Sequence, residues 1–278
     1  MAAQEAYDAA IAELAVERWR DGRVERTTDR IAEEVPVALT YHGVPHVVML
    51  ATPTHLEELA IGFTLTEAIV DSAQEIRSVA AVPGEDGGFE VQIGIDMARF
   101  AELLRRPRNL AARTGCGLCG AETVEQAIRH PRVLSDRLRV SAIEMHAALA
   151  ALRDHQTINR MTGSVHASAW VVPGEGIQIV REDVGRHNAL DKVIGTMVRA
   201  GRSFDDGFFI TTSRASYEMV QKSATVGAGM LVAVSAPTAF AVRLAQEAGL
   251  TLVGFAREHQ HVAYAHAHRI VEREAAAT

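Results

Sequence analysis

The chain of 278 residues is poor in cysteine: only Cys116 and Cys119 are present, and they stand three positions apart. This count excludes a framework of several disulfides. The spacing also argues against one structural disulfide, because closing so small a loop removes little entropy from the unfolded chain. Two sulfur atoms this close together, on a segment flanked by glycine, indicate that the thiols react or bind a ligand rather than hold the fold together. We expect this segment to handle sulfur, a metal or electrons.

Long apolar runs and an excess of positive charge are also lacking. No segment approaches the ~18–20 uncharged apolar residues that span a bilayer, and the formal net charge is -7. We therefore expect neither membrane insertion nor nonspecific binding of nucleic acid. The acidic N-terminal segment lacks the basic and apolar regions of a signal peptide, so we expect a cytoplasmic protein whose thiols stay reduced.

The N-terminal part of the chain divides into an extension and a small domain. Residues 1–30 predict a helical extension, with a helix from about Glu5 to Arg20 and a charged stretch after it. Residues 31–102 predict a small α+β domain, in which Thr54 and Glu57 form the capping box of a helix. The strands expected in this domain are Val35 to Tyr41, His46 to Leu50, Ile76 to Val82 and Phe89 to Ile95.

The rest of the chain begins with a loop and continues as an α/β domain. Residues 103–125 have little periodicity and predict an exposed loop that carries the cysteine pair. Residues 126–278 alternate between strand and helix patterns, which predicts a mostly parallel sheet with helices on both faces. Its expected strands are Ala167 to Val172, Ile177 to Val180, Phe208 to Thr211, Met230 to Val234 and Leu250 to Phe255, and its expected helices include His187 to Ala200, Ser216 to Val226 and Thr238 to Ala248.

The cysteine pair has three readings, of which sulfur chemistry is favoured over metal binding and over no role. A thioredoxin-like pair opens a helix directly after a strand, and that context is missing. A zinc ribbon needs a second ligand pair, and no other cysteine exists. Nearby arginines favour the thiolate, which is the form that attacks a persulfide or a disulfide. They are Arg105, Arg106, Arg108 and Arg113.

Several polar segments predict an anion-binding pocket. The segment from Arg181 to Lys192 joins a strand to a helix and offers backbone donors and a guanidinium for a phosphate or a carboxylate. The alternative for this segment is an exposed, salt-bridged helix face. Three further segments follow successive strands, so we expect them at one edge of the sheet, where ligands bind in open α/β folds. They are Thr212 to Lys222, Ser235 to Thr238 and Gly254 to Arg257. His166, in a turn before a strand, is a weaker candidate.

Together these segments resemble the formate dehydrogenase accessory sulfurtransferase family (FdhD-type). The matching residues are Leu59, Gly62-Phe63, Glu67, Thr114 to Gly120, Gly163, His166-Ala167, Glu182 to Lys192, Arg214, Ser216, Glu218, Ser235 to Thr238, Gly254-Phe255 and Arg257. The resemblance extends from about Val35 to Tyr264. Ser213 and Ser164 depart from it, because the family often has glycine at these positions.

This resemblance implies a cytidine-deaminase-like three-layer α/β core with a smaller N-terminal α+β domain, assembled as a homodimer. It also implies a sulfurtransferase that takes persulfide sulfur from a cysteine desulfurase and passes it to the molybdenum bis-guanine-dinucleotide cofactor of formate dehydrogenase. That cofactor is bound as a substrate, and no permanent cofactor or metal site is expected. Cys116 is then the persulfide carrier and Cys119 its helper. The cofactor contacts implied are Phe255, Ala256, Arg257, Glu258, His259, Gln260, Arg214, Ser216, Thr238 and His187.

Two other functions compete with this interpretation. A zinc deaminase needs a His-x-Glu ligand and base followed by a Pro-Cys-x-x-Cys segment. Here His166-Ala167-Ser168 lacks the glutamate and the cysteine pair precedes the histidine, so we reject a deaminase. The second alternative stays open: a noncatalytic chaperone that binds the molybdenum cofactor for formate dehydrogenase and uses its cysteines only for docking.

Overall fold

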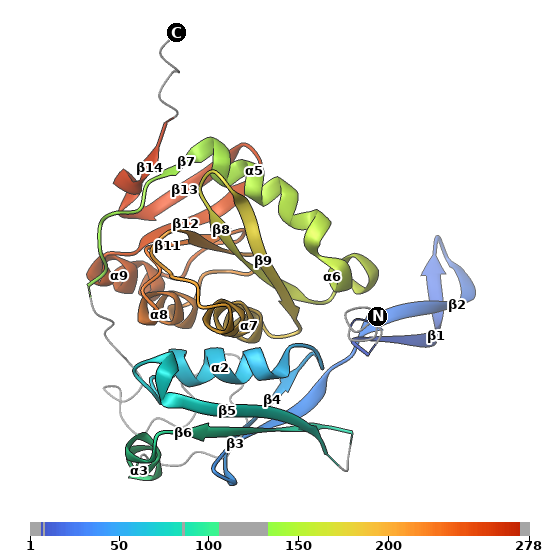
Figure 1. Ribbon diagram of the computed structural model, residues 1–278. Helices are drawn as coiled ribbons and strands as arrows, with labels where there is room; N and C mark the ends of the chain where they lie inside the picture. Colours follow the sequence, from blue (N-terminus) through green and yellow to red (C-terminus); the bar gives the residue numbers. More distant parts are fainter. Residues whose placement is uncertain (1–6, 8, 85–86, 106–132, 273–278) are drawn as a thin grey trace.

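The computed structural model describes residues 7, 9–84, 87–105 and 133–272 (Figure 1). These residues form a mixed α/β structure with two principal sheets, one above the other in the figure. The cysteine pair, on the predicted loop at 103–125, lies outside the described residues. No helix in the described ranges is long and apolar enough to cross a membrane.

The smaller sheet has four strands in the order β4-β3-β6-β5. Its strands are β3 (Val35–Tyr41), β4 (Val44–Ala51), β5 (Ile76–Pro83) and β6 (Phe89–Ile95). Helix α2 (Leu56–Thr66) lies between this sheet and the rest of the molecule, and η1 (Ala73–Glu75) and α3 (Met97–Arg105) complete the unit. Alternate strand residues such as Val37, Leu39 and Tyr41 are fully buried and pack against α2. The alternation of apolar residues along the strand therefore places one face of the sheet in the core.

The larger sheet has six strands in the order β13-β12-β11-β10-β8-β9. They are β8 (His166–Val172), β9 (Gly176–Asp183), β10 (Phe208–Thr211), β11 (Met230–Ala233), β12 (Thr251–Arg257) and β13 (Gln260–Ala265). Only the neighbours β10-β11 and β11-β12 run parallel, while the other three pairs are antiparallel. The prediction of a mostly parallel sheet is therefore wrong. Strands joined by a short turn, as in β8-β9 and β12-β13, pair with opposite directions because a parallel connection needs a long crossover.

Helices cover both faces of this sheet and make three layers. One face packs against α7 (Arg186–Arg199), α8 (Tyr217–Thr225) and α9 (Ala239–Ala248) through Trp170, Phe209 and Leu231. The other face packs against α5 (Ala142–Leu152) through Phe208 and Ile210. Short elements flank α5 and the C-terminal end: β7 (Val140–Ser141), η2 (Arg153–His155), α6 (Thr157–Thr162), η3 (Ala267–Arg269) and β14 (Ile270–Val271).

The N-terminal extension is a β-hairpin, so the prediction of a helix from Glu5 to Arg20 is wrong. Strands β1 (Ile11–Arg20) and β2 (Arg23–Ala32) pair antiparallel and project from the body of the molecule. Asp21 and Gly22 both have positive φ, 49° and 75°, as a two-residue type I′ turn requires. An Asp-Gly pair between alternating apolar and charged residues is a strong hairpin signal, and it outweighs the weaker helical pattern.

The two parts of the molecule meet where α2 crosses α7, and two glycines allow the close approach. A Cβ atom built on Gly62 would lie 1.9 Å from the backbone oxygen of Asp191, and one on Gly195 would lie 1.9 Å from that of Glu58. Neither position has room for a side chain. The crossing therefore holds the smaller sheet firmly against the helices that border the larger one.

Candidate functional site at the carboxyl edge of the larger sheet

The carboxyl ends of β10, β11 and β12 lie together, because these three strands are parallel neighbours. Backbone hydrogen bonds connect the segments that follow them. Ser235 N donates to Ser213 O at 3.4 Å, Thr238 N donates to Ala215 O at 3.0 Å, and Phe255 N donates to Ser235 O at 3.2 Å. The structure thus brings three of the sequence-predicted segments to one edge.

Phe255 is the most unusual residue at this edge. Its φ is 50°, in the left-handed region that a bulky residue rarely adopts, and its side chain is 47% exposed. A register shift between Gly254 and Arg257 marks a bulge in the pairing of β12 with β13 at this point. An aromatic ring held at a backbone cost and left open to solvent is characteristic of a binding site.

The other residues predicted after Phe255 have different environments. Ala256 is buried in the core beside α5, so its side chain does not face a ligand. The Arg257 guanidinium donates to the carbonyl oxygens of Val234 and Ala256, which ties β12 to the end of β11. Three exposed residues complete the predicted segment: Glu258, His259 and Gln260.

The hydroxyl groups at the start of α8 and α9 differ in their hydrogen bonding: one has a partner and the other has none. Thr238 Oγ1 accepts a hydrogen bond from Ala241 N at 3.2 Å and so caps α9. Ser216 holds the equivalent place before α8, but its side chain makes no cap hydrogen bond. Its buried Oγ has no hydrogen-bond partner among the described residues. Buried polar atoms are normally paired, so Ser216 is a candidate ligand contact, with the exposed Arg214 close by in sequence.

His187 joins this group through a carboxylate. Its Nε2 lies 2.6 Å from Glu218 Oε2, and the side chains are 17% and 10% exposed. His187 is in the first turn of α7 and Glu218 in the first turn of α8, so the pair links two helix N-termini.

The other predicted histidine is His166. Burial lowers its pKa, and the positive charge of Arg186 nearby lowers that pKa further, so we expect the His166 imidazole to be neutral at pH 7.

Much of the charged segment from Arg181 to Lys192 is used inside the protein instead. Lys192 Nζ lies 2.6 Å from Asp183 Oδ2, with both side chains fully buried, and donates to Thr52 O at 2.9 Å. Asp183 Oδ2 also accepts from Thr52 N at 3.1 Å. Burial lowers the pKa of Lys192, and the neighbouring Asp183 opposes that shift. These contacts bind the end of β4 to α7.

A second buried pair in the same interface connects α7, α8 and α2. Lys222 Nζ lies 2.8 Å from Asp191 Oδ2 and donates to Thr66 Oγ1 at 2.8 Å, while Thr66 Oγ1 donates to Asp191 Oδ1 at 2.9 Å. Burial alone would lower the pKa of Lys222, but Asp191 and Glu67 outweigh it and raise that pKa. Glu182, also buried, accepts from the backbone of Ile158 and Asn159 and so caps α6. The charged segment is therefore neither an exposed helix face nor, for these residues, an anion site.

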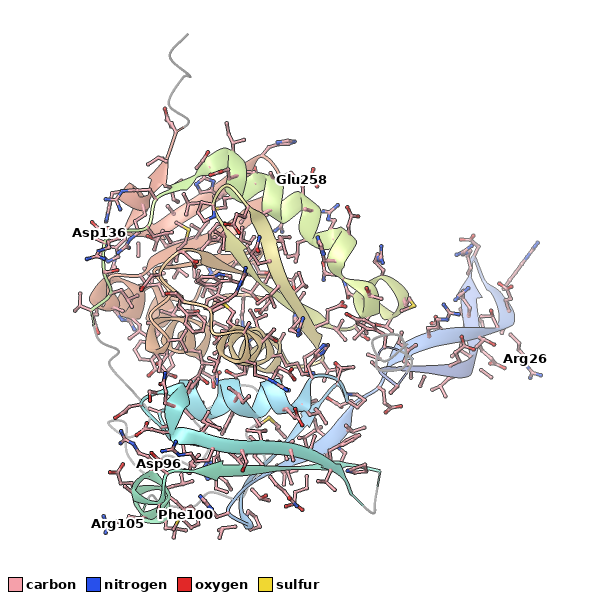
Figure 2. All side chains as sticks on the ribbon, viewed as in Figure 1. Arg26, Asp96, Phe100, Arg105, Asp136 and Glu258 are labelled. Atoms are coloured by element: carbon pink, nitrogen blue, oxygen red, sulfur yellow. The ribbon has the colours of Figure 1, made fainter. Side chains whose placement is uncertain are left out.

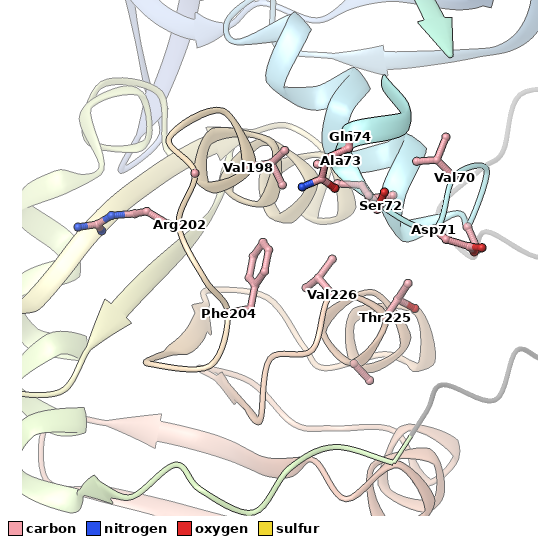
Figure 3. Close-up of a pocket in the computed structure, with 14 residues that line it drawn as sticks. Val70, Asp71, Ser72, Ala73, Gln74, Val198, Arg202, Phe204, Thr225 and Val226 are labelled. Carbon is pink, nitrogen blue, oxygen red and sulfur yellow. The ribbon is translucent and has the colours of Figure 1, made fainter. Parts of the chain in front are cut away.

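A cavity of about 630 Å³ lies elsewhere, between the end of α2 and the C-terminal ends of α7 and α8 (Figure 3). Phe204, Val226 and Ser72 are among its lining residues. The described residues that line it include none of the predicted site residues. Within the described ranges, no group of three or more His, Cys, Asp or Glu side chains is placed to hold a metal ion.

Residues 32–271 match the model of the FdhD/NarQ family. The chain belongs to this family. It is 48% identical to a protein of Cupriavidus necator named "Sulfur carrier protein FdhD", over 92% of this chain and 89% of that relative. It is 49% identical to the protein of the same name from Xanthomonas euvesicatoria, over 92% of this chain and 90% of the relative. The family membership implied by the sequence motifs is confirmed.

The same fold occurs in a crystal structure described as a putative formate dehydrogenase accessory protein from Desulfotalea psychrophila. The TM-score is 0.78, and the match covers 94% of this chain and 100% of that one at 22% identity. This similarity supports the mixed α/β architecture. The finer prediction of cytidine-deaminase-like layering stays a prediction, although the three layers themselves are present.

The structure leaves the two cysteines of this FdhD/NarQ protein outside the described residues, so it does not place Cys116 or Cys119 relative to the edge of the sheet. It adds Glu218 to the candidate site as the partner of His187, a role that the sequence motif did not reveal. Because the two residues are 31 positions apart and on different helices, only the packing of α7 against α8 brings them together.

Proposed function

We propose that this protein is a sulfurtransferase that accepts persulfide sulfur on Cys116 from a cysteine desulfurase. It then passes the sulfur to the molybdenum bis-guanine-dinucleotide cofactor of formate dehydrogenase, with Cys119 as helper. The observation that carries the proposal is the 48% identity, over 92% of the chain, to a protein named as a sulfur carrier. The proposal includes a cytoplasmic homodimer. It also includes association with formate dehydrogenase, and the description of the structural relative as a formate dehydrogenase accessory protein supports this association alone.

The loading step needs only a thiolate. The Cys116 thiolate attacks the outer sulfur of the desulfurase persulfide, a new sulfur–sulfur bond forms on Cys116, and the desulfurase cysteine leaves as a thiolate. No oxidant or reductant is consumed. Since Cys116 and Cys119 are the only cysteines in the chain, no other thiol competes for the sulfur.

The carboxyl edge of the larger sheet supports the delivery half of the proposal. Phe255 offers an exposed ring on which a guanine base stacks, and Ser216 offers an unpaired hydroxyl for a polar group. Arg214 supplies a positive charge suited to a phosphate, and the first turns of α8 and α9 point backbone N–H groups toward this edge. We assign this edge to the dinucleotide part of the cofactor.

The experiment is intact-protein mass spectrometry after incubation with a cysteine desulfurase and cysteine. We expect wild type to gain about one sulfur atom per chain, in a form that a thiol reductant removes. Cys116→Ala should gain none, while Cys119→Ala should still be loaded. Loading of Cys116→Ala equal to that of wild type would contradict the assigned carrier.

The chaperone alternative makes a different prediction in the same experiment. A protein that only escorts the cofactor takes up no sulfur, and its Cys116→Ala variant still supports maturation of formate dehydrogenase. No gain of mass on wild type with an active desulfurase, together with a mature dehydrogenase from Cys116→Ala cells, would replace the sulfurtransferase by the chaperone.

A further inference from the structure

The cavity near the ends of α2, α7 and α8 is not used by the proposed function. Its volume of about 630 Å³ is in the range of small-molecule binding sites. It lies where the two parts of the molecule meet, because Leu65 packs against the hydrophobic cluster of the smaller sheet, whereas Phe204 and Val226 pack against that of the larger one. Elsewhere on this boundary side chains of the two parts are in direct contact, as Lys222 Nζ and Thr66 Oγ1 are at 2.8 Å (Figure 2). Boundaries of this kind are a common place for ligand sites.

Most of the described residues that line this cavity are apolar. Leu65, Val198, Phe204 and Val226 are only half-buried, so each leaves apolar surface open to the cavity. In Figure 3, Phe204 and Val226 face Ala73 across the open space. An apolar molecule in this space would remove these surfaces from water, which is the main driving force for binding a ligand of that kind.

Phe204 gives the cavity an aromatic wall with a fixed orientation. Its ring packs edge-to-face on Trp170, with a centroid distance of 5.7 Å and an interplanar angle of 81°. The Phe209 ring lies 6.2 Å away, and both neighbouring side chains are fully buried. Because these contacts hold the ring from the core side, its cavity side is free to pack against a flat aromatic ligand.

The charged residues of the lining interact with groups outside the cavity. Asp71 forms an ion pair with Arg99, and Arg202 donates to Gln178 Oε1 at 3.2 Å. Figure 3 shows the Arg202 guanidinium pointing away from the centre of the cavity. The exposed Gln74 differs from them, because its carboxamide points toward Val198. The cavity therefore offers a neutral hydrogen-bonding group and no charge aimed at its centre.

We propose that this cavity binds a small uncharged aromatic molecule that carries one hydrogen-bonding group. The aromatic part lies against Phe204, Val226 and Val198. Its polar group bonds to the Gln74 carboxamide, which can both donate and accept. A ligand here contacts both parts of the molecule and so stabilises the folded protein when it binds. The inference is independent of sulfur transfer and of the carboxyl edge of the larger sheet.

The test is calorimetric titration of the full-length protein with naphthol, a flat uncharged aromatic alcohol. We expect saturable one-to-one binding to wild type, with a dissociation constant roughly millimolar or tighter. Naphthoate has the same rings and a carboxylate. It should bind at least about tenfold more weakly, because its charge would lose water without gaining a cation. Naphthoate binding as tight as that of naphthol would overturn the assignment to an uncharged ligand.

Two variants fill the cavity from opposite sides. Val226→Trp and Ala73→Phe should each weaken naphthol binding at least about tenfold, because the new side chain takes the space of the ligand. Circular dichroism establishes that each variant is folded, and the second variant serves if the first is not. The matched control is Val82→Trp, the same change at a 41% exposed position of β5 outside the cavity. It should bind naphthol within about threefold of wild type.

Two further variants locate the probe in the protein. Gln74→Leu keeps the size of the side chain but removes its hydrogen-bonding group, so it should weaken naphthol binding about threefold or more. Phe255→Ala removes the exposed ring at the carboxyl edge and should bind naphthol as wild type does. No saturable binding to wild type, unchanged binding in both filled variants, or loss of binding in Phe255→Ala would overturn the proposal.

Discussion

The interface between α2 and α7 and the carboxyl edge of the larger sheet are both built from charged and hydroxyl side chains, but they use them differently. At the interface, Lys192, Asp183 and Thr52 satisfy one another and no solvent reaches the lysine. At the edge, Ser216 Oγ is unpaired and Phe255 is strained and exposed. A cluster of charges in a sequence therefore identifies a ligand site only when its polar groups remain unsatisfied in the fold.

The largest effect is expected where the buried charges are removed one at a time. Lys192→Met leaves the Asp183 carboxylate buried without its cation, which should lower the free energy of unfolding by about 3–5 kcal/mol. Urea denaturation measures this. The control on the same helix is Arg199→Met, whose pairs with Glu57 and Glu58 are solvent-exposed and should cost less than about 1 kcal/mol. Equal losses in the two variants would remove the distinction between buried and exposed pairs in this protein.

A second effect at the interface depends on pH. Burial, with the positive charges of Arg181 and Lys192, lowers the pKa of His55 from 6.5 to about 4. Between these values the unfolded chain binds more protons than the folded one, so His55 contributes stability above pH 6.5 that is lost as the pH falls toward 4. The loss is at most about 3 kcal/mol, and partial exposure of the ring reduces it.

The variant His55→Asn tests this dependence without straining the backbone. His55 has a φ of 53°, and asparagine tolerates the left-handed region better than most residues. Urea unfolding measured from pH 4 to pH 7 should show a flatter profile for the variant than for wild type. An unchanged slope would assign the acid sensitivity to other groups.

The smallest effect on stability is expected at the edge of the sheet. There, a substitution should change ligand binding more than it changes the free energy of unfolding. Phe255→Gly removes the left-handed strain and should leave the free energy of unfolding within about 1 kcal/mol of wild type. It also removes the stacking surface, so it should weaken binding of a guanine nucleotide by roughly tenfold or more. Phe255→Ala should weaken binding to the same extent without relieving the strain.

Nucleotide titration by calorimetry, beside urea denaturation of the same variants, gives both quantities. A Phe255→Gly variant that binds the nucleotide as wild type does would exclude this ring from the dinucleotide site. A large loss of stability in that variant would instead make Phe255 part of the structural core, and the contrast between the two regions would disappear.

Several elements were predictable because their signals are local. Strands β3, β6 and β10 have the predicted bounds, since apolar alternation or a short apolar run between turn residues suffices to define them. Helices α7, α8 and α9 begin and end within about two residues of prediction, as expected for helix ends. The prediction for the N-terminal segment was wrong because the spacing of its apolar residues is compatible with both a helix and a strand. The Asp-Gly turn decided in favour of the hairpin.

Other features had no local signal. Strand β13 is short, with charged and histidine residues before it, and it forms because the turn after Arg257 returns the chain to β12. The predicted capping box of α2 is absent: His55 is the N-cap and Thr54 is buried. The pairing of His187 with Glu218 likewise needed two helices to be packed side by side.

For the candidate site, the residues and their order along the chain were enough to place three strand ends at one edge, because parallel neighbouring strands must end on the same side. They were also enough to identify the family. Which polar groups are satisfied was decided only by the tertiary structure. Hydrogen bonds and desolvation depend on atoms brought together from distant parts of the chain. Asp183 and Lys192 therefore became buried contacts of Thr52, while Ser216 Oγ stayed unpaired and Phe255 stayed exposed at the edge.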